Sequence, residues 1–554
     1  MERLASPIEA LAAHYDVVVV GSGYGGSIVA SRLSRAGRRV CVLERGRERV
    51  EGEFPETLAH AAKEVQIELR GRRLGDRDAL FDVRVGEDIN VLVGCGLGGT
   101  SLINAGVALR PDRRVFETAF PRALREDLPR LDEAFARAEA MLGTTTCPSA
   151  ESLHKFVALR RCAETLATAE PTMHVKFFAA PINVTFEDGV NAAGVAQRAC
   201  IHCGNCITGC NHRAKNVLTM NYLPDAKRHG AELFTGVVVS HVTRDGDRWR
   251  VHAEDGVEVS ADLVVIAAGV LGSTELLYRS RTHGLALSDR IGARFSGNGD
   301  VVGFAYDGRE EVDGVARVHD DDPPCGPTIT GVIDARGTEA MADGVVIEDS
   351  AIPSALSSIA PALLAAARAL GGTNTAPGEW LQQEARELES LVHGAHRGAT
   401  RNTQTFLVMS HDDGNGEVVY QNDRVSIVWP EVGAQARFET IDRDLMLASS
   451  ALGAIYTRDP IWAKWLNRNL ITVHPLGGCP MGDDSTSGVV DHVGQVFDGV
   501  TATSLHDGLF VCDGAILPTP LGVNPLLTIS ALAERACVYI ARARGWSIDY
   551  STNA

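Results

Sequence analysis

Four clustered cysteines are the first residues whose types and spacing suggest chemistry. Cys200, Cys203, Cys206 and Cys210 follow the spacing of the bacterial ferredoxin motif that binds a [4Fe–4S] cluster, except that Asn211 replaces the usual proline. Four thiolates also satisfy a tetrahedral zinc ion, and reduced or disulfide-linked loop cysteines are a third interpretation. The spacing favours a metal site, with iron–sulfur ahead of zinc.

A glycine-rich turn near the N-terminus predicts a dinucleotide site. The apolar residues 17–20 are typical of a buried strand, and they lead into residues 21–26, GSGYGG, which match G-x-G-x-x-G. A helical pattern and a second strand at residues 40–43 follow, and that strand ends in Glu44. Gly21 permits the tight turn, Gly23 lets a pyrophosphate approach the backbone, and Gly26 lets helix and strand pack closely. The alternative is a glycine-rich turn in an ordinary α/β unit.

A second glycine-rich loop lies at residues 94–99, GCGLGG. A loop that almost lacks side chains can place its backbone N–H groups against a flat or anionic ligand. It can equally be a tight loop packed under another loop, and the sequence alone does not choose between the two.

Size and charge exclude several classes of protein. The chain has 554 residues, 45% of them hydrophobic, and a formal net charge of −18, which argues against a nucleic-acid or anionic-membrane binder. No stretch reaches the ~20 apolar residues of a membrane span, and the N-terminus lacks the features of a secretory signal. We therefore expect a cytoplasmic protein without an integral membrane segment.

Further elements are expected to join the first sheet or to form insertions. Residues 263–269 predict a second strand–turn–helix unit that returns to the first sheet. Asn524 followed by Pro525 predicts the start of a long C-terminal helix, with Asn524 as its N-cap. Residues 354–370, rich in Ala and Leu, predict a core helix or, as the less favoured alternative, an apolar lid over the substrate.

Five blocks in the same order resemble the glucose–methanol–choline (GMC) flavin oxidoreductases, and within them the bacterial cholesterol oxidase branch. They are the N-terminal glycine motif, GCGLGGTSLINAG, LVVIAAGVLGSTELL, HPLGGCPMG and DGAILPTPLGVNPLLTISALAER. The resemblance implies an α/β fold with an α+β substrate part, in which a Rossmann-like FAD-binding domain carries an inserted substrate domain built on a β-sheet covered by helices. The FAD-binding domain would comprise residues 14–48, 88–110, 215–302 and 471–548, the substrate domain 49–87, 111–199 and 303–470, and the cysteine loop 200–214.

The same resemblance implies FAD as the bound dinucleotide. The residues expected to bind it are Gly21, Gly23, Tyr24, Gly25, Gly26, Glu44, Gly98, Gly99, Ser101, Asn104, Gly106, Val239, Asp513, Gly514, Asn524, Pro525 and Leu526. The N-terminus of the last helix would face the flavin, where its dipole stabilises negative charge.

Three residues are the catalytic candidates. Taken alone, a His before Pro-Leu-Gly-Gly is more often structural, but the resemblance assigns His474 to accept or share the hydroxyl proton of an alcohol. Asn524 would hydrogen-bond the alcohol oxygen without competing for the proton. Glu348 falls where cholesterol oxidases place a carboxylate that moves a proton during double-bond isomerisation, although a solvated strand-end residue is the alternative.

The function predicted from the sequence is FAD-dependent oxidation of a secondary alcohol to a ketone, on a bulky hydrophobic substrate for which a steroid is one candidate. The electron acceptor is expected to be oxygen or, if the cysteines hold an iron–sulfur cluster, a redox protein or quinone. The alternatives are a dehydrogenase or isomerase of the same fold acting on another alcohol, and an electron-transfer flavoprotein without a small substrate.

Overall fold

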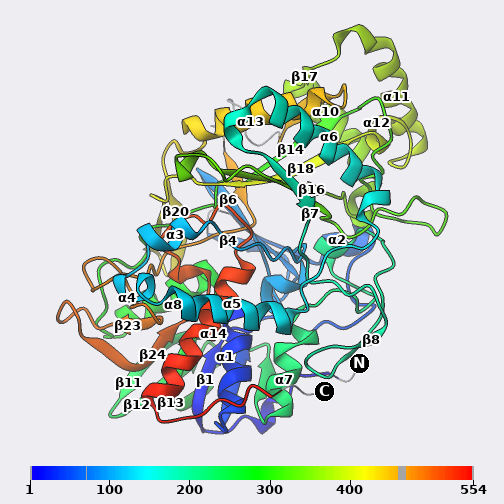
Figure 1. Ribbon diagram of the computed structural model, residues 1–554. Coiled ribbons are helices and arrows are strands. Elements are labelled where there is room, and N and C mark those ends of the chain that lie inside the picture. Colours follow the sequence, from blue (N-terminus) through cyan, green and yellow to red (C-terminus); the bar gives the residue numbers. More distant parts are fainter. Residues whose placement is uncertain (1–2, 70, 460–468, 552–554) are drawn as a thin grey trace.

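An eight-stranded sheet forms the lower half of the molecule in Figure 1. The computed structural model describes residues 3–69, 71–459 and 469–551, so residues 460–468 of the predicted substrate segment 303–470 lie outside the described part. The strands of the main path, in spatial order, are β10 (Glu232–Thr235), β2 (Val40–Glu44), β1 (His14–Val20), β13 (Glu258–Ile266), β12 (Arg248–Ala253) and β11 (Val239–Asp245); β24 (Leu505–Val511) pairs with β13 and with β23 (Gln495–Phe497).

The parallel part of this sheet carries the predicted dinucleotide motif. β1 pairs in parallel with β2 on one side and with β13 on the other, so that Val17 lies opposite both Val40 and Leu263. Val17 and its three following valines are buried, as expected for a strand covered on both faces. The predicted return of residues 263–269 to the first sheet is confirmed.

Three helices pack together beside this sheet (Figure 1): α1 (Tyr24–Arg35), α14 (Leu526–Ala543) and α5 (Leu128–Leu142). α14 packs against both α1 and α5. The buried Arg32 of α1 donates three hydrogen bonds of 2.6–3.0 Å to Glu534 of α14, and this pair ties the first helix of the chain to the last. The long C-terminal helix predicted from the sequence is confirmed, but it begins at Leu526.

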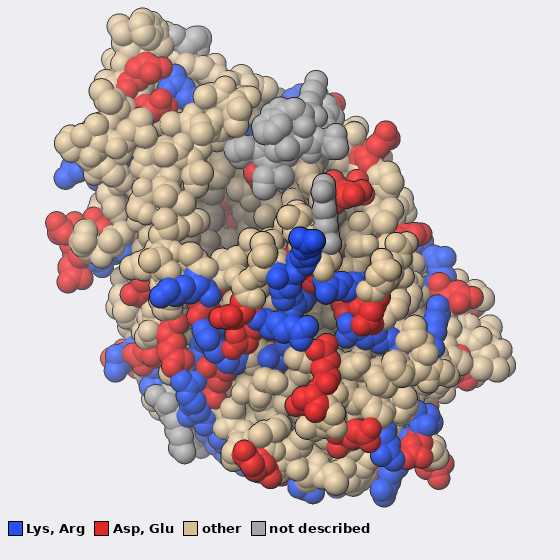
Figure 2. Space-filling view, turned by 180° about the vertical axis from the view of Figure 1, so that it is seen from behind, with Lys and Arg blue, Asp and Glu red and all other residues tan. Residues whose placement is uncertain are grey.

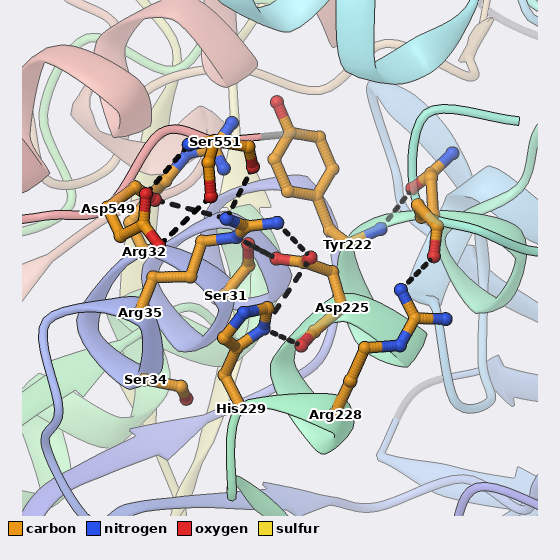
Figure 3. A network of polar contacts seen from close by, with 12 residues as sticks. Ser31, Arg32, Ser34, Arg35, Tyr222, Asp225, Arg228, His229, Asp549 and Ser551 are labelled. Carbon is orange, nitrogen blue, oxygen red and sulfur yellow. Dashed lines mark hydrogen bonds and ion pairs between the residues drawn. The ribbon is translucent and has the colours of Figure 1, made fainter. Parts of the chain in front are cut away.

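A second buried ion pair ties α1 to α7 (Tyr222–Arg228). Figure 3 shows Arg35 and Ser31 of α1 turned toward Asp225 of α7. Arg35 donates two hydrogen bonds of 2.6 and 2.8 Å to the Asp225 carboxylate, and Ser31 Oγ donates a third of 2.6 Å. Arg35 also reaches the backbone carbonyls of Asp549 and Ser551, so the same cation holds the C-terminal tail.

A seven-stranded antiparallel sheet forms the upper half of Figure 1. Its strands, in spatial order, are β17 (Thr373–Asn374), β21 (Ile455–Arg458), β14 (Val301–Tyr306), β18 (Gln404–Ser410), β16 (Val345–Ser350), β15 (Gly331–Asp334) and β7 (Lys176–Ala179). The helices α6 (His154–Ala169) and α13 (Ala436–Ser450) pack on each other and on this sheet.

A third sheet has five strands and takes them from two distant segments of the chain. Its order is β22 (Leu470–Thr472), β6 (Ile89–Gly94), β5 (Phe81–Val85), β3 (Val65–Leu69) and β4 (Arg72–Leu74). Strands from the segment 49–87 therefore pair with a strand from 88–110, although the sequence assigned these two segments to different domains. The division of the chain into domains stays a prediction.

Eight further α-helices and two hairpins lie within the described residues. The longer helices are α8 (Gly269–Thr282), α10 (Ala360–Gly371) and α11 (Trp380–His393). The short ones are α2 (Leu58–Lys63), α3 (Arg113–Thr118), α4 (Arg122–Arg125), α9 (Ser354–Ser357) and α12 (Gly398–Arg401); the hairpins are β8 (Gly189–Val190) with β9 (Ala196–Gln197), and β19 (Glu417–Gln421) with β20 (Arg424–Val428).

None of the described helices is both long and apolar enough to cross a membrane.

Candidate active site

A cavity of about 1310 Å³ brings together segments from the whole length of the chain. The turn between β1 and α1, the second glycine loop, the start of α8 and the start of α14 all line it. Figure 2 shows a hollow near the centre of one face, with Lys and Arg side chains gathered below it. A cavity of this size exceeds what a single drug-sized ligand needs, so it has room for a large cofactor and a substrate together.

Two glycines of the first glycine turn allow close backbone packing, and a third leaves open space at the cavity. A Cβ at Gly21, whose φ is +96°, or at Gly26 would overlap a backbone carbonyl oxygen, so both positions require glycine for close packing. A Cβ at Gly23 would meet nothing within 4 Å, and Gly23 lines the cavity. α1 begins at the next residue without a side-chain cap, so its first N–H groups are available to an anion in the cavity.

Glu44 stands at the end of β2, at the edge of the cavity. Its carboxylate accepts hydrogen bonds from Ser22 N, Ser22 Oγ and Gly46 N at 3.1, 2.6 and 2.7 Å. Burial raises the pKa of Glu44, while these donors act in the opposite direction. The first glycine turn therefore fixes the orientation of this carboxylate.

The second glycine loop packs against the first glycine turn and also lines the cavity. Both predicted roles of this loop, packing under another loop and facing a ligand, are therefore present. A Cβ at Gly99 would lie 2.9 Å from Gly23 Cα. Asn104 Nδ2 donates to the hydroxyl of Tyr24 at 2.9 Å, whereas the buried Asn104 Oδ1 has no hydrogen-bond partner among the described residues. An unpartnered buried oxygen beside a large cavity is what a bound ligand would satisfy.

Most of the residues predicted to bind the cofactor line this cavity. They are Gly21, Gly23, Tyr24, Gly25, Glu44, Gly99, Asn104, Gly106, Val239, Asp513, Gly514, Asn524, Pro525 and Leu526. Within the described residues, Gly26, Gly98 and Ser101 are not part of the lining. They support it instead, because Gly98 N donates to Ser22 Oγ at 2.9 Å and Ser101 Oγ donates to Gly98 O at 2.7 Å.

Asp513 follows β24 and caps the next turn of the chain. Its carboxylate accepts hydrogen bonds from Gly269 N, Ser273 Oγ and Ala515 N at 2.8, 2.5 and 2.8 Å. Burial raises the pKa of Asp513. The carboxylate joins the start of α8 to the turn after β24, and both segments line the cavity.

His474 follows β22 and lines the cavity, and the carboxylate of Asp300 holds one of its ring nitrogens. Its Nδ1 lies 2.9 Å from Asp300 Oδ1. The other oxygen of Asp300 accepts from Thr472 Oγ1, Val473 N and His474 N at 2.9–3.2 Å. Because this carboxylate can only accept, Nδ1 carries the proton and Nε2 keeps its lone pair. Nε2 makes no hydrogen bond to any described residue, so it is free to accept one from a ligand in the cavity.

Asn524 and Glu348 form a second pair of polar side chains, and Asn524 lines the same cavity as His474. Asn524 Nδ2 lies 3.3 Å from Glu348 Oε2, whereas Asn524 Oδ1 and Glu348 Oε1 are buried without hydrogen-bond partners among the described residues. Burial raises the pKa of Glu348 to about 8. Asn524 lines the cavity, but within the described part of the chain Glu348 lies behind it and is not part of the lining.

The prediction that Asn524 is the N-cap of the last helix is wrong. Pro525 occupies the cap position, and no side chain caps this helix. The Asn524 side chain is turned toward Glu348 instead. Its amide is therefore available to the cavity rather than used by the helix.

A buried turn at residues 296–300, which sequence reasoning missed, holds the His474 side chain and the backbone that precedes Asn524. Asp300 binds His474, as described above. Asn298, at φ +57°, accepts from Leu521 N and Gly522 N and donates to Val523 O at 2.8–3.0 Å, which fixes the segment before Asn524. The turn signals in SGNGD were visible in the sequence, but nothing there connects them to positions 474 and 524.

Another part of the cavity lining is an apolar wall. α9 and α10, formed by the predicted core helix or lid, contribute to this wall, and α10 keeps Leu364 buried while Leu363 is 56% exposed. The apolar lining on this side is formed by Val302, Phe304, Ile329, Ile352, Leu356, Leu363, Leu364, Phe406 and Leu407.

The four clustered cysteines lie outside this cavity, and together they line a second, small one. All twelve cysteines of the chain are within the described residues, and all are free. Ile207 and Thr208, which directly follow Cys206, line the large cavity. The cysteine loop is therefore adjacent to the candidate active site.

Comparison with known proteins shows the relatives of this chain. Two profiles of the GMC oxidoreductase family match residues 15–296 and 437–533. A cholesterol oxidase of Mycobacterium tuberculosis (strain H37Rv) is 28% identical over 94% of this chain and 90% of its own, and one of Acinetobacter baumannii is 26% identical over 95% and 94%. A long-chain-alcohol oxidase of Arabidopsis thaliana is 23% identical over 94% of this chain and 66% of its own.

The structure of pyridoxine 4-oxidase from Mesorbium loti superposes with a TM-score of 0.59 at 17% identity, covering 95% of this chain and 99% of that one. The predicted α/β fold with a Rossmann-like part is thereby confirmed.

Proposed function

The chain belongs to the GMC oxidoreductase family, and we propose that it oxidises a secondary alcohol on a bulky hydrophobic substrate to a ketone. The observation that carries the proposal is the arrangement of His474, Asp300 and Asn524. One imidazole lone pair and one amide face a single cavity, and that cavity has a wide apolar wall. A proton acceptor and an oxygen-binding group at the polar end of an apolar cavity suit a hydrophobic alcohol.

GMC oxidoreductases bind FAD, and the residues present fit this cofactor. The open approach at Gly23, the uncapped start of α1 and the unpartnered Asn104 Oδ1 would meet its phosphate and flavin parts. We assign the seventeen predicted cofactor residues to this site, with Gly26, Gly98 and Ser101 acting as support, and the FAD-binding domain to the segments predicted above. When bound, FAD supplies the acceptor for the hydride that leaves the alcohol carbon.

The residues of the chain perform the proton chemistry. His474 Nε2 accepts the hydroxyl proton of the alcohol, and the Asp300 carboxylate stabilises the positive charge that then develops on the ring. Asn524 orients the alcohol oxygen through its side-chain amide. In this arrangement Glu348 positions Asn524 from behind.

Glu348 also supports a second activity, isomerisation of a double bond next to the new ketone. Its buried carboxyl has a pKa raised to about 8, so it can hold and release a proton near neutral pH. This activity requires the substrate to reach past Asn524, because Glu348 is not part of the cavity lining among the described residues.

The substrate class follows from the shape and polarity of the wall. Branched and aromatic side chains from β14, α10 and β18 form a broad apolar surface, which suits a rigid polycyclic or a long linear alcohol. The relatives named as cholesterol oxidases and as a long-chain-alcohol oxidase act on these two shapes. We favour the rigid, steroid-like class.

The proposal includes an electron acceptor and a location. We propose oxygen, a redox protein or a quinone as the electron acceptor, and the cytoplasm, which the sequence predicts, as the location. The competing function is an electron-transfer flavoprotein without a small substrate; the convergence of His474 and Asn524 on the cavity favours an enzyme over this relay.

Anaerobic mixing tests the proposal directly. We expect a sterol to bleach the flavin absorbance of the purified protein within seconds, and a His474→Gln variant with full flavin content to be slowed by about 10²–10⁴-fold. A linear long-chain alcohol run in parallel separates the two substrate shapes. A flavin that no alcohol reduces, but that exchanges electrons with a reduced ferredoxin, would support the relay and refute the proposed oxidation.

A further inference from the structure

We propose that Cys200, Cys203, Cys206 and Cys210 hold a [4Fe–4S] cluster beside the active-site cavity. The proposal goes beyond the proposed alcohol oxidation and does not depend on it. Its first support is that the four side chains, spread over eleven positions of an irregular loop, converge on one small cavity in the folded chain. No disulfide uses any of them.

The backbone conformation of the cysteine loop is of the kind that turns N–H groups toward a bound anion. His202 and Gly204, between the first three cysteines, have φ values of +58° and +83°. His202 N lies 3.4 Å from Cys200 Sγ, so one backbone donor already points at a ligand sulfur. Successive residues of alternating hand form concavities that bind anions, including iron–sulfur centres.

Two contacts fix the end of this loop, where Asn211 departs from the ferredoxin pattern. Asn211, in the place of the usual proline, accepts from Gly52 N and Phe54 N and donates to Phe54 O at 2.9–3.2 Å, so its amide anchors the loop to a neighbouring segment. A Cβ at Gly209 would overlap the Phe54 ring, which makes glycine necessary there. The fourth cysteine is thereby held next to the other three rather than directed to a distant site.

A buried cation provides the second, independent observation. Lys215 is 2% exposed, and its ammonium donates to Cys206 O and Leu102 O at 2.8 and 3.1 Å. No carboxylate in the described part of the chain pairs with it. A buried ammonium without a counter-charge is costly. A cluster with four thiolate ligands carries net negative charge and would supply the missing partner.

The spacing of the sulfurs argues against zinc. Four thiolates on one zinc ion lie about 3.8 Å apart, since each Zn–S bond is about 2.3 Å long and the site is tetrahedral. Among the described residues, no three of these Sγ atoms lie within 4.8 Å of one another. Thiolates at the corners of a cubane are farther apart than those around one zinc ion, so this spacing does not oppose an iron–sulfur cluster.

The position of the loop suggests what such a cluster does. Ile207 and Thr208, next to Cys206 in sequence, line the active-site cavity, and Lys215 links Cys206 to Leu102, which follows the second glycine loop. Oxidation of one alcohol to a ketone releases two electrons and two protons. A cluster alternating between two oxidation states carries those electrons singly, so the acceptor class it requires is a one-electron carrier protein, which takes one electron in each of two steps, while the protons go to solvent.

The experiment uses the full-length protein purified without oxygen and supplied with iron and sulfide. We expect roughly four iron and four acid-labile sulfide per chain, and an electron paramagnetic resonance signal after reduction. Cys203→Ser should lose most of the iron and the signal, whereas the matched control Cys147→Ser, a buried cysteine elsewhere, should keep both. Lys215→Met should lower the reduction potential of the cluster while leaving its iron content unchanged.

Three results would overturn the proposal: one zinc per chain, loss of free thiols to a disulfide, or a folded protein that binds no iron. Flavin content and alcohol-dependent flavin bleaching, measured on the same preparation, separate this failure from that of the proposed oxidation. Cys203→Ser is expected to retain both.

Discussion

Replacing Asp300 by asparagine should disable His474 without removing its hydrogen-bond partner. Three donors, Thr472 Oγ1, Val473 N and His474 N, meet one oxygen of Asp300, so the amide oxygen of the variant must take that place. The amide nitrogen then faces His474 Nδ1 and donates to it. The ring must hold its proton on Nε2 instead, where it cannot accept the hydroxyl proton of an alcohol.

The expected magnitude is that of losing a correctly oriented base. An equivalent tautomer reversal in serine proteases costs about 10⁴-fold, and general base catalysis as a whole is worth about 10²–10⁴-fold. We expect Asp300→Asn to reduce flavin at a rate about 10³-fold lower, equivalent to about 4 kcal/mol. KM should change little, because the apolar wall that binds the substrate is intact.

The assay is the rate of anaerobic flavin reduction by a sterol, with bound flavin measured from its absorbance. Asp412→Asn is the matched control: Asp412 is a buried carboxylate that holds the same turn through Ser296 Oγ and Gly299 N, at 2.8 and 2.9 Å, but does not contact His474. The double variant with His474→Gln should be no slower than His474→Gln alone. Full activity in Asp300→Asn would refute the assignment, and the smaller loss expected in Asp412→Asn measures what the stability of the turn alone contributes.

Three further predictions concern the cofactor, the second carboxylate and stability. Gly23→Ala should fold normally but bind FAD more weakly, because its methyl group enters the cavity; Gly189→Ala, whose Cβ also meets nothing within 4 Å, is the control, and bound flavin per chain is the measurement. The pKa of Glu348 is raised from 4.5 to about 8, so the folded state keeps a proton that the unfolded state loses, and the free energy of unfolding should fall as the pH rises through this range. Denaturant titrations at several pH values should show a smaller fall in Glu348→Gln. The same variant should lose any isomerase activity. Asp225→Ala leaves the buried Arg35 without its carboxylate and should lower the free energy of unfolding by about 3–5 kcal/mol, with flavin reduction per folded molecule unchanged; an unchanged denaturant midpoint would contradict this.

The parts of the site that the sequence predicts well are those encoded within one short segment. The strand, glycine turn, helix and acid of residues 17–44 follow each other directly, so pattern and backbone chemistry identify them together. The cysteine loop is equally local, since its spacing is visible without any knowledge of the fold. The pairing of β13 with β1 was also accessible, because parallel strands of one α/β unit usually return to a common sheet.

The parts that escaped prediction are contacts between distant segments. Asp300 lies 174 positions before His474, and Glu348 lies 176 positions before Asn524. No periodicity or motif links such pairs, since they meet only through the packing of β22, β16 and the turn before α14. The error about the N-cap has the same origin: an Asn before Pro is a good local cap, but tertiary contacts gave its amide another partner.

The turn at residues 296–300 explains why these distant contacts depend on each other. Asp300 sets the proton position of His474, and Asn298, two residues earlier, holds the backbone that presents Asn524. Ser296 is joined to the strand-like segment after His474 through two hydrogen bonds with Leu476, at 2.9 and 3.0 Å. A shift of this turn would therefore displace the proton acceptor and the oxygen-binding amide together. Since reacting groups must be held within a fraction of an ångström, the rigidity of one buried turn controls the geometry of both.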